Sequence, residues 1–166
     1  MYLRDYKESD ANEIIKWIHS ERDFRLWSFK RYNDYPAKPQ DINENYKKCI
    51  SEGHFYPKTL VDGERVVGHI VLRNPDANED IVRLGFVIVD SDLRGKGYGK
   101  RLLQEAIKYA KNELKAKEIN LGVFSANESA YKCYMSVGFK VKRIDKNVLK
   151  YNEEEWDCIE MVLQND

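Results

Sequence analysis

The first third of the chain changes from a two-residue to a helical spacing of apolar positions. Alternation over residues 2–6 predicts a short first strand. Ser9-Asp10 can then cap a helix, whose apolar positions are Ala11, Ile14, Ile15 and Trp17–Ile18. A second helix is expected over 40–52 and closes at Gly53. The segment between these helices is rich in aromatic residues and ends at Pro36 and Pro39; it contains Phe24, Trp27, Phe29, Tyr32 and Tyr35.

Strand patterns dominate the middle of the chain. Residues 54–61 and 65–72, joined by the turn Asp62-Gly63, predict a β-hairpin. The run 81–89 is β-branched and apolar, which is typical of a central strand buried on both faces. We therefore expect the centre of a sheet to be built from this part of the chain.

The strongest helical pattern covers about 98–115 and follows a glycine-rich loop. Its apolar stripe consists of Leu103, Ala106, Ile107, Ala110 and Leu114. Beyond it the pattern predicts a strand over 118–124, a short helix over 127–137, and closing strands over 139–144 and 156–163. Because hairpins flank the alternating strands and helices, we expect an α/β fold with a mixed, mostly antiparallel central sheet flanked by helices.

Composition and charge narrow the class of protein. The 166 residues form one expected domain, 1–166, without repeats or linkers. Lys+Arg 28 balances Asp+Glu 28, so no net charge attracts nucleic acid or an anionic membrane. No apolar run approaches the roughly 20 residues that span a bilayer, and residues 1–10 lack the apolar core of a signal peptide. Cys49, Cys133 and Cys158 are expected as buried thiols, so the interpretation is a soluble, cytoplasmic protein.

The candidate chemistry lies in the loop before the long helix. Its sequence is Arg94-Gly95-Lys96-Gly97-Tyr98-Gly99-Lys100. Alternating glycines at a strand-to-helix junction let backbone N–H groups surround an anion, and the helix N-terminus adds positive potential. With the cationic side chains, this pattern predicts a phosphate or pyrophosphate ligand. The alternative is a tight turn with a solvated basic edge. The GxGxxG and P-loop spacings both fail, which argues against a nucleotide-binding regulator.

Two motifs carry a resemblance to a known family. Arg94, Gly97 and Gly99 fit the pattern (Gln/Arg)-x-x-Gly-x-(Gly/Ala). A second pattern, Asn-x-x-Ala-x-x-x-Tyr-x-x-x-Gly-Phe, is matched in full by Asn127, Ala130, Tyr134, Gly138 and Phe139. Together with the strand 86–89 before the loop, they resemble the GNAT superfamily of acetyl-CoA-dependent acyltransferases, over about 80–140. The opening of the chain resembles the subgroup that acetylates protein N-termini, spermidine or small drugs.

The resemblance implies an N-acetyltransferase without a metal. It would move acetyl from acetyl-CoA to a primary amine of a protein N-terminus, a polyamine or a small molecule, in a ternary complex. The cofactor strand would splay from its neighbour at a bulge, so that the backbone of Val87, Ile88 and Val89 meets the pantetheine arm and the thioester oxygen. The loop 94–100 would hold the pyrophosphate.

Two residues of the second motif receive specific roles from the resemblance. Tyr134 is the candidate general acid for the leaving thiolate. Asn127 lies two helical turns earlier on the same face, where it would bind the pantetheine or cap its own helix. Tyr131 lies one turn before Tyr134, and only the motif spacing prefers Tyr134. A core or interface side chain is the alternative for this tyrosine.

The general base is where the sequence departs from many relatives. Many relatives carry an acidic residue at one of two positions, which in this chain are occupied by Arg83 and Gly122. The alternatives are His69, an acid of the stretch 153–160, or a water chain. His69 is more typical of a core histidine, and the acidic stretch of a solvated turn. The missing acids leave a second hypothesis, an acyl-CoA-binding sensor or pseudoenzyme without turnover.

Three further features remain open at the level of sequence. The aromatic segment 24–35 falls where the family folds two helices over the acceptor, so its rings either line the amine pocket or form ordinary core. His19, His54 and His69 show no metal-ligand spacing. A closing strand such as 156–163 could pair across a homodimer.

Overall fold

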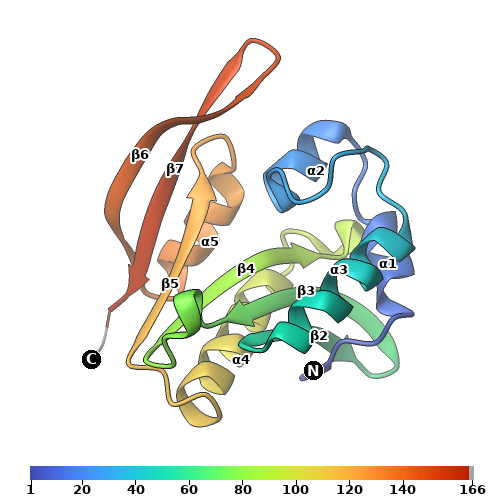
Figure 1. The fold of residues 1–166 in the computed structure, drawn as a ribbon, viewed down its shortest axis with the longest axis vertical. Helices are drawn as coiled ribbons and strands as arrows, with labels where there is room; N and C mark the ends of the chain where they lie inside the picture. The colour runs from blue at the N-terminus through green and yellow to red at the C-terminus, as the bar shows by residue number, and fades with distance from the viewer. Residues whose placement is uncertain (165–166) are drawn as a thin grey trace.

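The computed structural model describes residues 1–164, in which seven strands form one sheet with helices packed against it (Figure 1). The strands run in the order β1-β2-β3-β4-β5-β7-β6, and β4–β5 is the parallel pair. This confirms the expected mixed, mostly antiparallel α/β sheet. The elements are β1 Tyr2–Asp5, α1 Asp10–Lys16, α2 Glu21–Ser28, α3 Pro39–Glu52, β2 Phe55–Asp62, β3 Arg65–Arg73, the 3-10 turn Pro75–Ala77, β4 Ile81–Val89, the 3-10 turn Ser91–Leu93, α4 Tyr98–Asn112, β5 Glu118–Phe124, α5 Glu128–Ser136, β6 Phe139–Tyr151 and β7 Glu154–Leu163.

Helix α2 is the element that the hydrophobic pattern did not identify. It begins after Ser20, whose hydroxyl oxygen accepts a hydrogen bond from the backbone N–H of Asp23 at 3.1 Å. Phe24 and Ser28 lie on its buried face. With eight residues the helix is too short to show a sustained period, and the neighbouring aromatic residues mask the one that exists.

Buried residues form two clusters, one on each side of the sheet. The first lies between the sheet and α4, which contributes Leu102, Leu103, Ala106 and Ala110. The second lies under α1, α2 and α3 and contains Ile14, Phe24, Ile42 and Tyr46. The expected stripe on α4 is therefore shifted, because Leu102 is buried while Ile107 is only partly so and Leu114 lies beyond the helix end.

Strand β4 is central, as expected, but it is not buried on both faces. Val82, Leu84 and Ile88 are buried, whereas Arg83 and Gly85 stay partly exposed. Its ladder with β5 ends at the pair Leu84↔Leu121. Just beyond, Phe86 has a φ of +51° and the register with β3 shifts, which is the geometry of a bulge. The two strands separate from this point, and the exposed face of β4 borders the gap.

The C-terminal hairpin differs most from expectation. Strand β6 continues to Tyr151 instead of ending at 144, and the long β6–β7 hairpin projects beyond the rest of the sheet (Figure 1). Strand β7 pairs with β5 on one side and β6 on the other, so the expected homodimer pairing through 156–163 is wrong. β1 and β6 are the edges instead.

Two smaller expectations concern the cysteines and membranes. Cys49, Cys133 and Cys158 are free thiols, but they are half-buried and not buried as expected. Among residues 1–164, no helix has the length and apolar character needed to cross a bilayer.

Candidate active site

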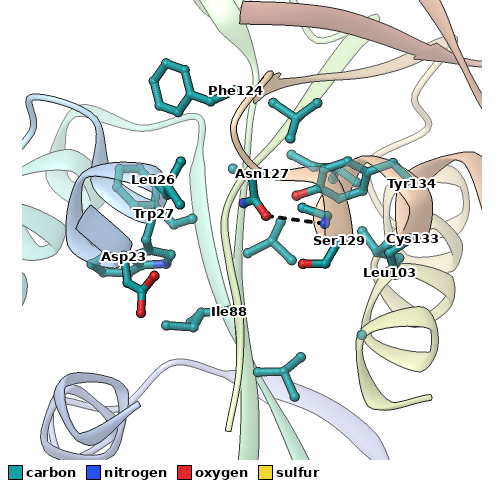
Figure 2. Close-up of a pocket in the computed structure, with 18 of the residues that line it drawn as sticks. Asp23, Leu26, Trp27, Ile88, Leu103, Phe124, Asn127, Ser129, Cys133 and Tyr134 are labelled. Carbon is teal, nitrogen blue, oxygen red and sulfur yellow. Dashed lines mark hydrogen bonds between the residues drawn. The ribbon is translucent and has the colours of Figure 1, made fainter. Parts of the chain in front are cut away.

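A cavity of about 860 Å³ opens where β4 and β5 separate. Its volume falls in the range typical of ligand sites. In Figure 2, Asp23, Leu26 and Trp27 of α2 face Asn127 and Tyr134 across the cavity. The wall is completed by the exposed face of β4, the end of β5 and the glycine loop, so elements from distant parts of the chain meet around one space.

The glycine loop forms one end of this cavity. Gly95 and Gly97 have φ values of +75° and +87°, which glycine adopts readily, and Gly97 leads directly into α4. Five of the seven predicted loop residues line the cavity, namely Arg94, Gly95, Gly97, Gly99 and Lys100. Lys96 and Tyr98 are not among the lining residues. The Tyr98 hydroxyl donates a hydrogen bond to Asp62 at 3.1 Å, which turns this side chain toward the β2–β3 hairpin.

The bulged strand forms the floor of the cavity. Val87, Ile88 and Val89 all line it, as the expected placement of the cofactor strand requires. Their side chains also pack into the core, with Val87 and Val89 against the α4 cluster and Ile88 within the other cluster. Successive side chains of a strand point to opposite faces, so consecutive residues serve both sides of the sheet.

Helix α5 brings Asn127 and Tyr134 to the same cavity. The Asn127 side-chain oxygen accepts a hydrogen bond from the Ala130 N–H at 3.4 Å, so the capping interpretation holds while the residue also lines the cavity. Tyr134 is 7% exposed, and burial raises the pKa of its hydroxyl above the usual value. The hydroxyl therefore stays protonated at neutral pH and can donate. Tyr131 does not line the cavity.

The α2 wall contains a carboxylate that the sequence did not single out. Asp23 lines the cavity, as does Glu128 at the start of α5, and neither makes an ion pair within residues 1–164. Either carboxylate can accept a proton from a ligand. The signal that could have found Asp23 is the family's placement of two helices over the acceptor. The aromatic residues divide: Phe24 and Tyr32 are core, whereas Trp27 and Phe29 line the cavity.

Arg83, at one of the two positions where the family resemblance implied an acid, forms an ion pair with Glu160. The Arg83 guanidinium donates two hydrogen bonds to Glu160, at 2.8 and 2.9 Å. Gly122 leaves room for it, because a Cβ at this position would lie 2.7 Å from Nη2 of Arg83. The expected solvated acidic turn is therefore wrong for Glu160, and also for two other acids of the stretch. Glu154 pairs with Arg22, and Asp157 pairs with Lys146.

His69 belongs to the core, and it does not line the cavity. It is fully buried, and one ring nitrogen is hydrogen-bonded to the Tyr46 hydroxyl at 2.8 Å. Burial lowers the pKa of His69 to about 4, so the ring is neutral near pH 7. No group of three His, Cys, Asp or Glu side chains suited to a metal occurs within the described part of the chain.

Comparisons with known proteins agree with this arrangement. The family described as acetyltransferase (GNAT) matches residues 13–139. A UPF0039 protein of Schizosaccharomyces pombe is 36% identical over 84 residues, which span 44% of this chain and 55% of that protein. The L-amino acid N-acetyltransferase of Escherichia coli is 30% identical over 103 residues, or 61% of this chain and 62% of that enzyme. The matches thus span less than two thirds of either relative's length.

Solved structures show the same fold over nearly the whole chain. A spermidine N-acetyltransferase from Vibrio cholerae, crystallised with CoA and spermine, superposes with a TM-score of 0.81. The superposition covers 97% of this chain and 93% of that chain, at 20% sequence identity.

Proposed function

Because the chain belongs to the acetyltransferase (GNAT) family, we propose that it transfers the acetyl group of acetyl-CoA to a primary amine by direct attack in a ternary complex. The observation that carries this proposal is the cavity that joins the glycine loop, the separated strands and the Tyr134 hydroxyl. The matched E. coli relative is named for amino acid acceptors, and the V. cholerae structure contains CoA with spermine. Both support an amine as the acceptor.

The residues of the cavity suit two parts of acetyl-CoA, its pyrophosphate and its pantetheine arm. The loop offers backbone N–H groups and the cations Arg94 and Lys100 to a pyrophosphate. The floor formed by Val87, Ile88 and Val89 is apolar in its side chains and polar in its backbone, which suits a pantetheine arm. When bound, the cofactor supplies an activated acetyl thioester. The protein's task is to orient it and the amine, because effective molarities of about 10⁵ M or more arise from positioning.

Two side chains on opposite walls can move the protons. The transfer forms a C–N bond and breaks a C–S bond, so the nitrogen loses a proton and the sulfur gains one. Asp23, on the α2 wall, accepts the amine proton, and the Tyr134 hydroxyl gives its proton to the thiolate. A thiol with a pKa near 8.5 leaves readily, so its donor needs only hydrogen-bonding reach. Glu160 is engaged by two hydrogen bonds from Arg83, whereas Asp23 makes no ion pair within residues 1–164.

The test is release of CoA thiol from acetyl-CoA with a panel of amines: spermidine, an aminoglycoside, amino acids and peptides with free N-termini. Turnover with one class supports the proposal and identifies the acceptor. Binding of acetyl-CoA without turnover on any amine would favour the sensor hypothesis. Failure to bind acetyl-CoA at all would contradict the interpretation of the glycine loop.

A further inference from the structure

Two arginines lie directly opposite each other on neighbouring strands. Arg73 of β3 and Arg83 of β4 are register partners, so their side chains leave the same face of the sheet. Like charges in directly opposed positions destabilise a sheet unless an anion lies near them. They line a second cavity of about 420 Å³, which also receives the basic residues Lys142 and Arg143 from β6. Asp76 and Glu160 are the carboxylates in its wall.

The two arginines differ in what neutralises them. Arg83 is held by Glu160 at 2.8 and 2.9 Å and by the Asn120 side-chain oxygen at 3.0 Å. Arg73 is partly buried, yet it makes no ion pair and no side-chain hydrogen bond within residues 1–164. Burial, together with the neighbouring guanidinium of Arg83, lowers the pKa of Arg73 against the opposing effect of Asp76 and Glu160. Arg73 therefore has the carboxylates of Asp76 and Glu160 in the same cavity wall but forms an ion pair with neither.

Arg73 lies beside the larger cavity because its register partner Arg83 lines that cavity. Arg83 lines both cavities. Its guanidinium lies over Gly122, which also lines the larger cavity, at the point where the β4–β5 ladder ends. A molecule that extends from the strand separation past Arg83 therefore meets Arg73 next. Arg31, whose guanidinium lies 5.0 Å from the ring centre of Phe86, adds a further positive charge beside the same wall.

Resting on the proposed function, we propose that the acceptor amine carries a carboxylate, which binds between Arg73 and Arg83. The substrate class is then amino acids and related amino-carboxylates. Arginine suits this role because its planar guanidinium can bind a carboxylate through two hydrogen bonds. A polyamine would bring positive charge against both arginines, whereas an amino-carboxylate with several bonds between its two groups can place its amine in the larger cavity and its carboxylate at the arginine pair.

The experiment compares L-ornithine and L-lysine, whose side-chain amine lies several bonds from the carboxylate, with their α-amides and with spermidine in the thiol-release assay. An amide keeps the amine and side chain but removes the negative charge. We expect amino acids to have a KM about 10- to 100-fold lower than their amides. Arg73→Gln should raise the KM for amino acids by a similar factor, leave the KM for amides unchanged, and leave kcat within about twofold. Arg73→Lys, which keeps the charge, should recover part of the affinity.

Two controls separate this proposal from simpler causes. Circular dichroism and the urea unfolding midpoint show whether Arg73→Gln is folded. Arg73→Lys retains the positive charge and is therefore the more conservative substitution. Arg143→Gln removes an exposed cation of the same cavity that already pairs with Asp145, so its KM should not change. An equal rise in KM for Arg143→Gln would indicate a diffuse positive field and would contradict a specific carboxylate site between Arg73 and Arg83.

The same assay distinguishes a wrong carboxylate site from a wrong reaction. If amides or spermidine are acetylated as efficiently as amino acids, the proposed carboxylate site is wrong. The proposed acetyltransferase activity would still stand. Absence of turnover on every amine overturns both.

Discussion

At the scale of single residues, the Tyr134 hydroxyl combines burial with a place on the cavity wall. Burial keeps it protonated beyond pH 10, so a loss of activity near pH 10 is not expected from this group. Tyr134→Phe should lower kcat by about 100-fold, near the lower end for proton transfer, because the thiolate leaves readily. Steady-state kinetics and acetyl-CoA binding measure the two effects, and affinity should be unchanged.

Tyr131 provides the matched control for this prediction. It lies one turn earlier on the same helix and does not line the cavity, so Tyr131→Phe should leave kcat unchanged. Undiminished turnover in Tyr134→Phe would show that another group protonates the thiolate.

Asp23 is expected to act at the other end of the proton path. Asp23→Asn removes the carboxylate and should lower kcat/KM by about 100-fold at pH 7. The defect should shrink as the pH approaches the pKa of the acceptor amine, because solvent then removes the proton. Glu21→Gln, on the same helix but away from the cavity, is the control. A defect of constant size at every pH would argue for a structural role of Asp23.

At the scale of elements, the strand-to-helix loop depends on backbone conformations that side chains disfavour. Gly97 has a φ of +87° and Gly63 a φ of +63°, and a Cβ added at either residue would meet no heavy atom within 4 Å. The cost of alanine at either site is therefore conformational, about 1–2 kcal/mol of unfolding free energy. Gly97→Ala alone should raise the KM for acetyl-CoA, by about tenfold. Urea unfolding and kinetics distinguish the effects, and an equal rise in KM for Gly63→Ala would contradict the loop's role.

Helix α2 lines the candidate site although its hydrophobic pattern in the sequence is weak. It supplies Asp23, Leu26 and Trp27 to the cavity and Phe24 to the core within two turns. A short helix that serves both a cavity and a core has no wide apolar stripe. Its place above the separated strands comes from contacts such as Trp27 with Phe86, ring centres 5.4 Å apart, and Phe29 with Phe124, also 5.4 Å apart.

At the scale of the whole molecule, His69 couples stability to pH. Its pKa is about 4 in the folded protein and near 6.5 when unfolded, so between these values the unfolded chain binds a proton that the native protein does not. This contribution to stability is complete above pH 6.5 and is lost as the pH falls toward 4. Between pH 7 and pH 5 the loss should be about 2 kcal/mol of unfolding free energy.

Urea unfolding at pH 7 and pH 5 measures this loss. His69→Gln can still hydrogen-bond to the Tyr46 hydroxyl but does not titrate, so its unfolding free energy should fall by about 2 kcal/mol less than that of the wild type. Parallel falls in the two proteins would show that His69 is not the group responsible.

Apart from α2, the order of strands and helices followed from the sequence, as did the two motifs of the candidate site, because they rest on local rules. Alternation and helical period located β4, α4 and β5, and glycine spacing located the glycine loop between β4 and α4. The seven-residue spacing of Asn127 and Tyr134 placed both on one helix face, and both line the cavity.

Tertiary structure alone decided which charges are free and which are paired. Glu160 and Arg83 are 77 residues apart, and Arg73 faces Arg83 only because β3 and β4 align in one register. Asp23 likewise enters the site through the packing of α2 over the separated strands. Ion pairing and burial depend on distances between segments remote in the chain, which local periodicity does not encode. The sequence therefore determined the proposed cofactor half of the site, and the fold determined the proposed acceptor half.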